Sequence, residues 1–283
     1  MTNEENLQPM RKKNRKNKQD RHEERLQRGN EQLAADNRKK QFDNDWKLDW
    51  FTPLGKQQDI VDAILSKDEY DEEGNQISFE KIFCTIQGSS GVGKTTTALH
   101  SALSLLKSGE YRQLIFAKNP TEVGDDKIGF LSGSETDKLQ AHYDTTKRIF
   151  HEFMSPQKLE NDLGSGKIRL TIPNFLLGAT FDYSIVIMDE CQTMSPSTMK
   201  LLLERCGVGT KYIIMGDSKQ NYSISKRKDG FRDFVEQVTK EYQGERESIS
   251  ELVSYTRLTS DENQRSEGSK FITKLYEDGD ILR

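Results

Sequence analysis

Residues 88–95 read GSSGVGKT, and this stretch constrains the fold more than any other part of the chain. It fits the pattern G-x-x-x-x-G-K-[ST] at every fixed position. An apolar run at residues 82–86 precedes it, and small residues typical of a helix start follow it at residues 95–98. Its glycines let successive backbone N–H groups face one anion, and the helix start adds partial positive charge. The sequence therefore predicts a strand, a phosphate-binding loop and a helix in direct succession.

The side chains of this loop have separate predicted roles in binding a nucleotide. Lys94 is expected to reach the β- and γ-phosphates, and the hydroxyl of Thr95 to bind Mg²⁺. We expect the other nucleotide contacts from the loop and the first helical turn, at Gly88, Ser89, Ser90, Gly91, Val92, Gly93 and Thr96.

Short apolar runs alternate with helical periodicity through the rest of the chain. We predict strands at residues 81–87, 113–117, 167–172, 184–188 and 211–215, and near 251–256. We predict helices at residues 56–65, 94–107, 135–153, 195–205 and 229–240, and around 261–277. This alternation is typical of an α/β fold in which helices cover both faces of a mostly parallel sheet.

Two of the later predicted strands end in polar residues. In an open parallel sheet, ligands bind beyond the carboxyl ends of the strands. The strand at residues 184–188 leads into Asp189 and Glu190, about 95 residues after the loop lysine. We predict that Asp189 holds Mg²⁺ and that Glu190 polarises the attacking water of a hydrolysis reaction. Gln220, after the strand at residues 211–215, is predicted to contact the γ-phosphate or the water; an ordinary strand-to-loop turn is the alternative.

Two further residues are candidates for the base and for the transferred phosphate. Residues 51–58 read FTPLGKQQ, and the amide of Gln58 offers the donor and the acceptor that the edge of adenine requires. No NKxD element that would read guanine is present, so ATP is the predicted nucleotide. Trp50 or Phe51 either stacks on the base or belongs to the core. Arg265 is a candidate for stabilising charge in the transition state, at its own site or at a neighbour's in a ring; an ordinary surface arginine is the alternative.

The N-terminus differs in composition from the rest of the chain. Residues 1–45 are predicted to form a basic tail that is disordered or partly helical, and residues 46–283 a single domain. The net charge of −4 predicts no nucleic-acid partner, but residues 11–18 read RKKNRKNK. This run is either a solvated tail or an arm that contacts phosphates of RNA or single-stranded DNA. No apolar run approaches 18 residues, there is no secretory signal, and the three cysteines form no CxxC pair, so a cytoplasmic protein without a membrane partner is predicted.

Four segments together resemble the PhoH-like ATPases. In chain order they are GSSGVGKT, KNPTEVGDDKIGFLSG, MDECQTMSPSTMKLLLERCGVGTK and MGDSKQ, and the similarity covers roughly residues 52–280. The resemblance implies a RecA-like core, similar to the first motor domain of superfamily 1 helicases, that binds and hydrolyses ATP and is linked to RNA or DNA. It also implies the same roles for the residues named above, with a basic residue at Lys118. A homo-oligomer, such as a hexameric ring, is the expected assembly.

The chain departs from that family at several positions. Ser132 stands where the family usually has proline, and Leu177-Gly178-Ala179 stands where it usually has arginines on both sides of the glycine. Residues 263–266 read NQRS and lack the histidine that often follows the arginine. By this resemblance, the departures and the small size of the chain would fit a phage-encoded member, and the protein would then lie in the host cytoplasm.

The loop at residues 124–138 carries a hydrophobic island, Ile128-Gly129-Phe130-Leu131. We expect it either to anchor a long loop to the core or to contact a subunit or nucleic acid. Three other functions remain open besides an ATPase that remodels nucleic acid. They are a nucleotide-gated switch read by a protein partner, a thymidine-type nucleoside kinase, whose usual four-cysteine zinc element is not found here, and a viral terminase motor.

Overall fold

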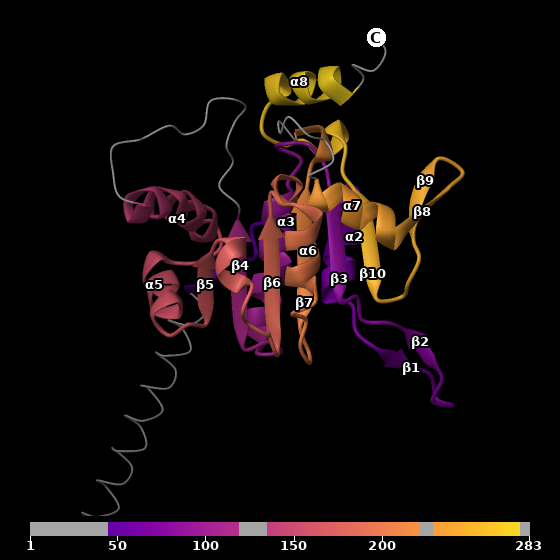
Figure 1. Ribbon diagram of the computed structural model, residues 1–283, viewed down its shortest axis with the longest axis horizontal. Coiled ribbons are helices and arrows are strands. Elements are labelled where there is room, and N and C mark those ends of the chain that lie inside the picture. The colour runs from indigo at the N-terminus through magenta and orange to yellow at the C-terminus, as the bar shows by residue number, and fades with distance from the viewer. Residues whose placement is uncertain (1–44, 119–134, 221–228, 278–283) are drawn as a thin grey trace, which may run out of the picture. The chain divides into compact units, whose positions relative to one another are not determined.

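The computed structural model describes residues 45–118, 135–220 and 229–277. The chain from Lys47 onward forms one compact unit, whose elements are drawn in Figure 1. The predicted tail at residues 1–45 and the hydrophobic island at residues 128–131 lie outside the described residues, apart from Asp45. The domain boundary at residue 46 therefore stays a prediction.

A six-stranded sheet forms the centre of this unit, and all of its strand pairings are parallel. Its spatial order is β10-β3-β7-β6-β4-β5. The strands are β3 (Phe83–Gln87), β4 (Gln113–Lys118), β5 (Ile168–Thr171), β6 (Ser184–Asp189), β7 (Lys211–Gly216) and β10 (Val253–Arg257). Every residue of β6 and β7 is buried, which explains why these strands are almost continuously apolar rather than alternating. The six predicted strands are thus confirmed.

The order of the strands identifies the fold. Strand β3 leads into the GSSGVGKT loop, β6 ends in Asp189, and β7 lies between them. The strand before the phosphate loop is therefore separated from the strand that carries the carboxylate by one further parallel strand. This is the RecA-like arrangement of a P-loop nucleotide-binding domain, as predicted.

Helices cover both faces of the sheet. They are α2 (Gln57–Leu65), α3 (Lys94–Ser108), α4 (Glu135–His151), α5 (Pro156–Gly164), α6 (Pro196–Leu203), α7 (Gly230–Val238) and α8 (Glu267–Glu277). Helices α6 and α7 lie on one face and α2 and α3 on the other, while α4 and α5 lie beside β5 (Figure 1). No helix in the described ranges is long and apolar enough to cross a bilayer.

The α6–α7 side holds a continuous apolar core. Alternate residues of β4, β6 and β7, such as Ile115, Val186 and Ile214, point to this side and are fully buried. They pack with Met199 of α6 and Phe231 of α7. This side of the sheet is thus closely packed beneath its carboxyl edge, where the polar strand ends lie.

The structure corrects two sequence predictions about local elements and adds a short hairpin before β3. This hairpin consists of β1 (Glu69–Tyr70) and β2 (Gln76–Ser78), and its turn is closed by Asp71, which accepts the N–H groups of Glu73 and Asn75. Helix α7 ends at Val238 because the chain enters a second hairpin, β8 (Thr239–Tyr242) and β9 (Glu245–Ser248). The predicted C-terminal helix is divided into the 3-10 turn η5 (Ser260–Glu262) and α8.

Candidate functional site

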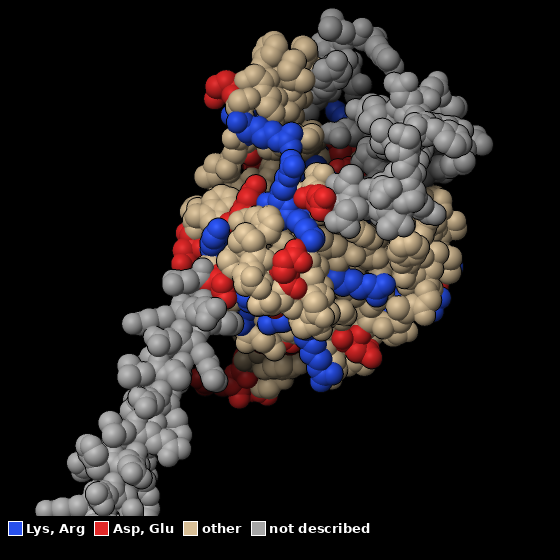
Figure 2. All heavy atoms as spheres, turned by 90° about the vertical axis from the view of Figure 1, so that its left-hand side faces the viewer, with Lys and Arg blue, Asp and Glu red and all other residues tan. Residues whose placement is uncertain are grey.

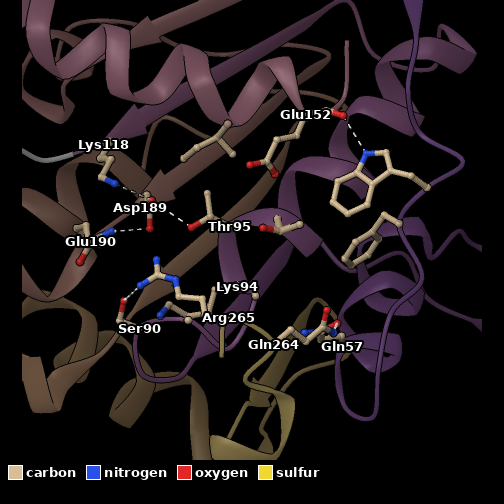
Figure 3. Close-up of a pocket in the computed structure, with 16 residues that line it drawn as sticks. Gln57, Ser90, Lys94, Thr95, Lys118, Glu152, Asp189, Glu190, Gln264 and Arg265 are labelled. Atoms are coloured by element: carbon tan, nitrogen blue, oxygen red, sulfur yellow. Dashed lines mark hydrogen bonds and ion pairs between the residues drawn. The ribbon is translucent and has the colours of Figure 1, made fainter. Parts of the chain in front are cut away.

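A cavity of about 430 Å³ lies at the carboxyl edge of the sheet (Figure 3). The ends of β4 and β6 reach it through Lys118 and Asp189, and the start of α3 reaches it through Lys94 and Thr95. Segments far apart in the sequence complete its wall, at Trp50, Phe51, Gln57, Ile149, Glu152, Gln264 and Arg265. The cavity therefore brings together most of the residues that the sequence singled out.

The predicted loop has the backbone that its glycines allow. Gly91 and Gly93 have φ angles of 89° and 86°, in the left-handed region where a side chain is strained. Space is also short, because a Cβ atom on Gly93 would lie 2.5 Å from Nε2 of Gln57. Helix α3 begins directly after this turn, so its first N–H groups point into the cavity.

Lys94 lies inside the curve of the loop. Its Nζ donates to the carbonyl oxygens of Gly88 and Ser89, at 2.6 and 2.9 Å. Burial lowers the pKa of Lys94, while the neighbouring carboxylates, Asp189 foremost, act in the opposite direction. A phosphate oxygen is a stronger acceptor for this ammonium than a neutral carbonyl, so the lysine is placed to exchange one for the other.

Asp189 is the centre of the polar contacts at the end of β6. The hydroxyl of Thr95 donates to its Oδ2 at 3.4 Å, and Nζ of Lys118 lies 3.6 Å from the same oxygen. Lys118 and Asp189 are register partners on β4 and β6, which places them side by side. Burial raises the pKa of Asp189, and Lys118 and Lys94 partly offset this.

The donor set fits Mg²⁺ of the kind that arrives with a nucleotide. Within the described ranges, no group of three or more His, Cys, Asp or Glu side chains is placed to hold a metal. The hydroxyl of Thr95 and the carboxylate of Asp189 supply two neighbouring oxygen ligands instead. Mg²⁺ prefers oxygen ligands and usually keeps waters and substrate phosphates among them.

Glu190 is held by a network that the sequence analysis did not assign. Its φ and ψ are 58° and 39°, a left-handed conformation that is uncommon for a residue with a side chain. The amide of Gln192 donates to Oε2 of Glu190 at 2.7 Å and accepts the N–H of Asp217 at 3.1 Å. Gln192, which is buried, thus ties the end of β6 to the end of β7 and fixes the Glu190 carboxylate. Its position two residues after Glu190 was the one signal in the sequence that could have identified Gln192 as part of the site.

Arg265 lies at the site of its own chain. Its Nη1 donates to the hydroxyl of Ser90 at 3.3 Å, and the guanidinium is drawn beside Lys94 in Figure 3. Oδ1 of Asn263 accepts the backbone N–H of Arg265 at 3.1 Å. The structure thus places Arg265 beside the phosphate loop of its own chain, and its predicted role stays a prediction.

The two predicted glutamines, Gln58 and Gln220, differ in what the structure shows of them. Gln220 is the last residue of the turn η3 (Ser218–Gln220), but its side chain is outside the described atoms, so its predicted role stays a prediction. Gln58 is exposed, and its amide donates to Asp62 at 2.7 Å, on the outer side of α2. Its neighbour Gln57 lines the cavity instead, is almost fully buried, and donates to the carbonyl of Val92 at 3.0 Å. The structure therefore places Gln57, and not the predicted Gln58, at the wall of the cavity.

An aromatic wall closes the end of the cavity opposite Asp189. The ring of Trp50 stacks on Phe153 with 5.4 Å between centroids, and its indole N–H donates to the carbonyl of Glu152 at 2.8 Å. Phe51 packs against the ring of His100 at 4.9 Å. Trp50 is 53% exposed, so a broad apolar surface remains beside the cavity.

A comparison with protein families agrees with this site. Residues 57–277 match the family model described as PhoH-like protein. The chain belongs to the PhoH-like protein family. This match covers the whole sheet and every residue of the cavity except Trp50 and Phe51.

Individual relatives match over shorter ranges. A PhoH-like protein of Synechocystis sp. is 31% identical over 162 residues, which is 57% of this chain and 48% of that protein. One of Bacillus subtilis is 32% identical over 133 residues, or 47% of this chain and 41% of that protein. The chain thus spans less than half the length of these two relatives. Among solved structures, the large terminase of a thermophilic bacteriophage has a TM-score of 0.42 and 12% identity, over 81% of this chain and 50% of that one.

Proposed function

We propose that this PhoH-like chain hydrolyses ATP in the cavity and that RNA or single-stranded DNA stimulates the reaction. One observation carries the proposal: a loop lysine, a hydroxyl–carboxylate pair and a fixed glutamate converge on one cavity. Each of these groups meets a separate requirement of phosphoryl transfer to water.

Each residue of the cavity has a separate role in the proposed reaction. The loop N–H groups and Lys94 bind the β- and γ-phosphates, and Thr95 and Asp189 hold Mg²⁺, which neutralises charge on the phosphate oxygens when bound. Glu190 orients the attacking water and accepts its proton, while Gln192 keeps that carboxylate aimed. Arg265 stabilises the charge that develops on the transferred group. Because these groups are held in place before the reaction, they stabilise its transition state without rearranging.

Gln57 and the aromatic wall favour adenine at the other end of the cavity. The Gln57 amide already donates one N–H to Val92 and accepts the N–H of Leu54, which fixes its plane. Its second N–H gives it one donor for the base, and its remaining lone pair, which accepts a longer bond from the Gln264 amide at 3.4 Å, becomes an acceptor for the base if the base displaces that amide. Trp50 offers a ring surface on which a purine stacks.

Adjacent glutamines provide a matched test of this assignment. We expect Gln57→Ala to weaken ATP binding about tenfold and to narrow the preference for ATP over GTP, since about one to two hydrogen bonds are lost. Gln58→Ala should bind both nucleotides like the wild type, because that side chain faces Asp62. Fluorescence titration with labelled ATP and GTP measures both constants. If the two variants had the same affinities for ATP and GTP, Gln57 would not be a residue that contacts the base.

The nucleic-acid part of the proposal is supported by the basic run at residues 11–18 and by the family resemblance. The described surface with α4 and α5 does not add to this support, because basic and acidic side chains are interspersed on it and form no continuous basic surface for phosphates (Figure 2). We expect poly-U or single-stranded DNA to raise ATP turnover at low salt, and the effect to fade as salt rises.

A charge-neutralised variant is the matched control for that experiment. Changing the basic residues of the 11–18 run to glutamine should abolish the stimulation while basal turnover stays the same, because the run is far in sequence from the cavity residues. If neither nucleic acid changed ATP turnover at low salt, the proposed stimulation by nucleic acid would be wrong, but the proposal that the chain hydrolyses ATP would not be affected.

A nucleotide-gated switch is the second candidate. It is favoured by the hydrogen bonds of Asn263, which join α8 to the backbone of Arg265 beside the cavity. Tight ATP binding with very slow turnover, unchanged by nucleic acid, would select this function. In either case we propose that several copies of the chain assemble, as in a ring.

A further inference from the structure

Helix α8 turns its apolar side outward and its polar side toward the domain. Phe271, Ile272 and Leu275 are 66%, 50% and 49% exposed, and we call them the α8 ridge. On its inner side, the hydroxyls of Ser269 and Thr273 accept hydrogen bonds from Nδ2 of Asn263, at 3.1 and 3.0 Å. An amphipathic helix of a globular domain normally packs its apolar side against the core. The reversed orientation indicates that the ridge is covered by something else.

A groove of complementary character lies between α6 and α7. It has a volume of about 480 Å³ and an apolar floor formed by Pro196, Met199, Leu203 and Phe234. Its rim carries Lys200 and Glu204 from α6 and Asp233 and Gln237 from α7. We call this the α6–α7 groove. It opens on a face of the sheet, whereas α8 lies beyond the carboxyl edge of the strands (Figure 1).

We propose that the α8 ridge of one copy of the chain docks in the α6–α7 groove of a second copy. The apolar ridge and the apolar floor match in character. Their charges are complementary at one point, since Lys270 and Lys274 lie along α8 and the rim presents the exposed carboxylate of Asp233, while Glu204 is already paired with Lys200 at 3.7 Å. One species of chain thus carries both halves of the contact, which argues for a second copy over an unrelated partner.

The contact joins two different surfaces, so it is a heterologous interface. When the same contact is repeated from copy to copy, the copies form a closed ring if the rotation between them allows it, and otherwise they form a filament. The inference deepens the proposed assembly and rests on it, but it does not depend on ATP hydrolysis.

The interface is also linked to the nucleotide site within each chain. Asn263 bonds α8 through its Nδ2 and the Arg265 backbone through its Oδ1. Its side chain lies close to Gly91, since a Cβ added there would be 3.1 Å from Nδ2. Docking on the outer side of α8 is therefore linked through Asn263 to the arginine beside the phosphate loop. Assembly is expected to raise the ATP turnover of each chain.

Sedimentation velocity of the full chain over a wide concentration range, with and without ATP, tests the interface. We expect the wild type to grow in mass with concentration. Phe271→Asp should weaken association about a hundredfold, because it places a charge in the apolar contact. Ile77→Asp is the matched control, since Ile77 is 63% exposed on β2 and lies in neither surface. A wild type that stays monomeric throughout, or equal effects of the two variants, would overturn the proposal.

A charge exchange tests which surfaces meet. Lys274→Glu on α8 and Asp233→Lys on the groove rim are both changes at exposed residues, and each alone should weaken association. A chain that carries both should recover most of it, because the pair is restored across the interface. Single effects without recovery would show that α8 meets another surface, and would overturn the assignment of the groove. ATP turnover recorded on the same samples separates a failed interface from a failed ATPase proposal.

Discussion

Lys94→Ala is expected to lower ATP turnover by about a thousandfold or more. The side chain is the loop's own cation, and it lies within the curve of the loop at 2.6 Å from the carbonyl of Gly88. Removal of one preorganised electrostatic contact to a transition state typically costs two to three orders of magnitude, and here the contact is charged. Affinity for ATP should fall more than affinity for ADP, because the ammonium reaches the γ-phosphate as well as the β-phosphate.

The measurement is steady-state phosphate release, with nucleotide affinity from fluorescence titration. Lys107→Ala is the matched control, since Lys107 lies in the last turn of the same helix, away from the cavity. It should hydrolyse ATP like the wild type. Circular dichroism and thermal unfolding establish that both variants fold. Turnover by a folded Lys94→Ala chain within a few-fold of the wild type would mean that the cavity is not the site of hydrolysis.

The arrangement of the sheet could be predicted because its signals are local. Each buried parallel strand is a short apolar run, and the fully buried strands β6 and β7 show the pattern without interruption. Loop glycines have positive φ angles that only their residue type permits without strain, so residues 88–95 indicate both a conformation and a ligand. The carboxyl ends of parallel strands share one edge, which brought Asp189 to the loop without any knowledge of the rest of the fold.

The assignment of Gln58 was wrong for a reason that the sequence contains. Gln57, Ile60, Val61 and Ile64 are the buried residues of α2, and their spacing is that of one helix face. Extending the apolar pattern back by one turn therefore points to Gln57. The two amides are chemically identical, and the phase of the helix distinguishes them, because neighbouring residues on a helix point about 100° apart.

Contacts between distant segments could not be predicted from local patterns. Gln192 acts through Asp217, which belongs to another strand end. Glu262 accepts the N–H of Lys56 and that of Thr259, so it joins the loop before α2 to the Arg265 segment. The position of Arg265 over its own phosphate loop depends on this joint and on Asn263. None of these pairings leaves a periodicity in the sequence, because each is set by how the ends of separate elements meet.

Glu190→Gln is expected to keep ATP binding and to reduce turnover by about a thousandfold, the effect of removing a general base. Glutamine has the same shape, and its amide oxygen can still accept the hydrogen bond from Nε2 of Gln192, which is 2.7 Å long in the wild type. The network to Asp217 is therefore retained, and the variant loses only the ability to take a proton from water. Single-turnover phosphate release and a nucleotide titration on the same sample measure the two effects.

Two comparison variants make the result specific to proton transfer. Glu267→Gln, an equivalent change at an exposed residue of α8, should hydrolyse ATP like the wild type. Gln192→Ala leaves the base in place but removes its support, so turnover should fall by a smaller factor of about ten. If Glu190→Gln turned over ATP at the wild-type rate, Glu190 would not be the base. If the turnover of Gln192→Ala fell as far as that of Glu190→Gln, the alignment of the Glu190 carboxylate would matter as much as its charge. The left-handed backbone conformation of Glu190 would then be part of the catalytic site.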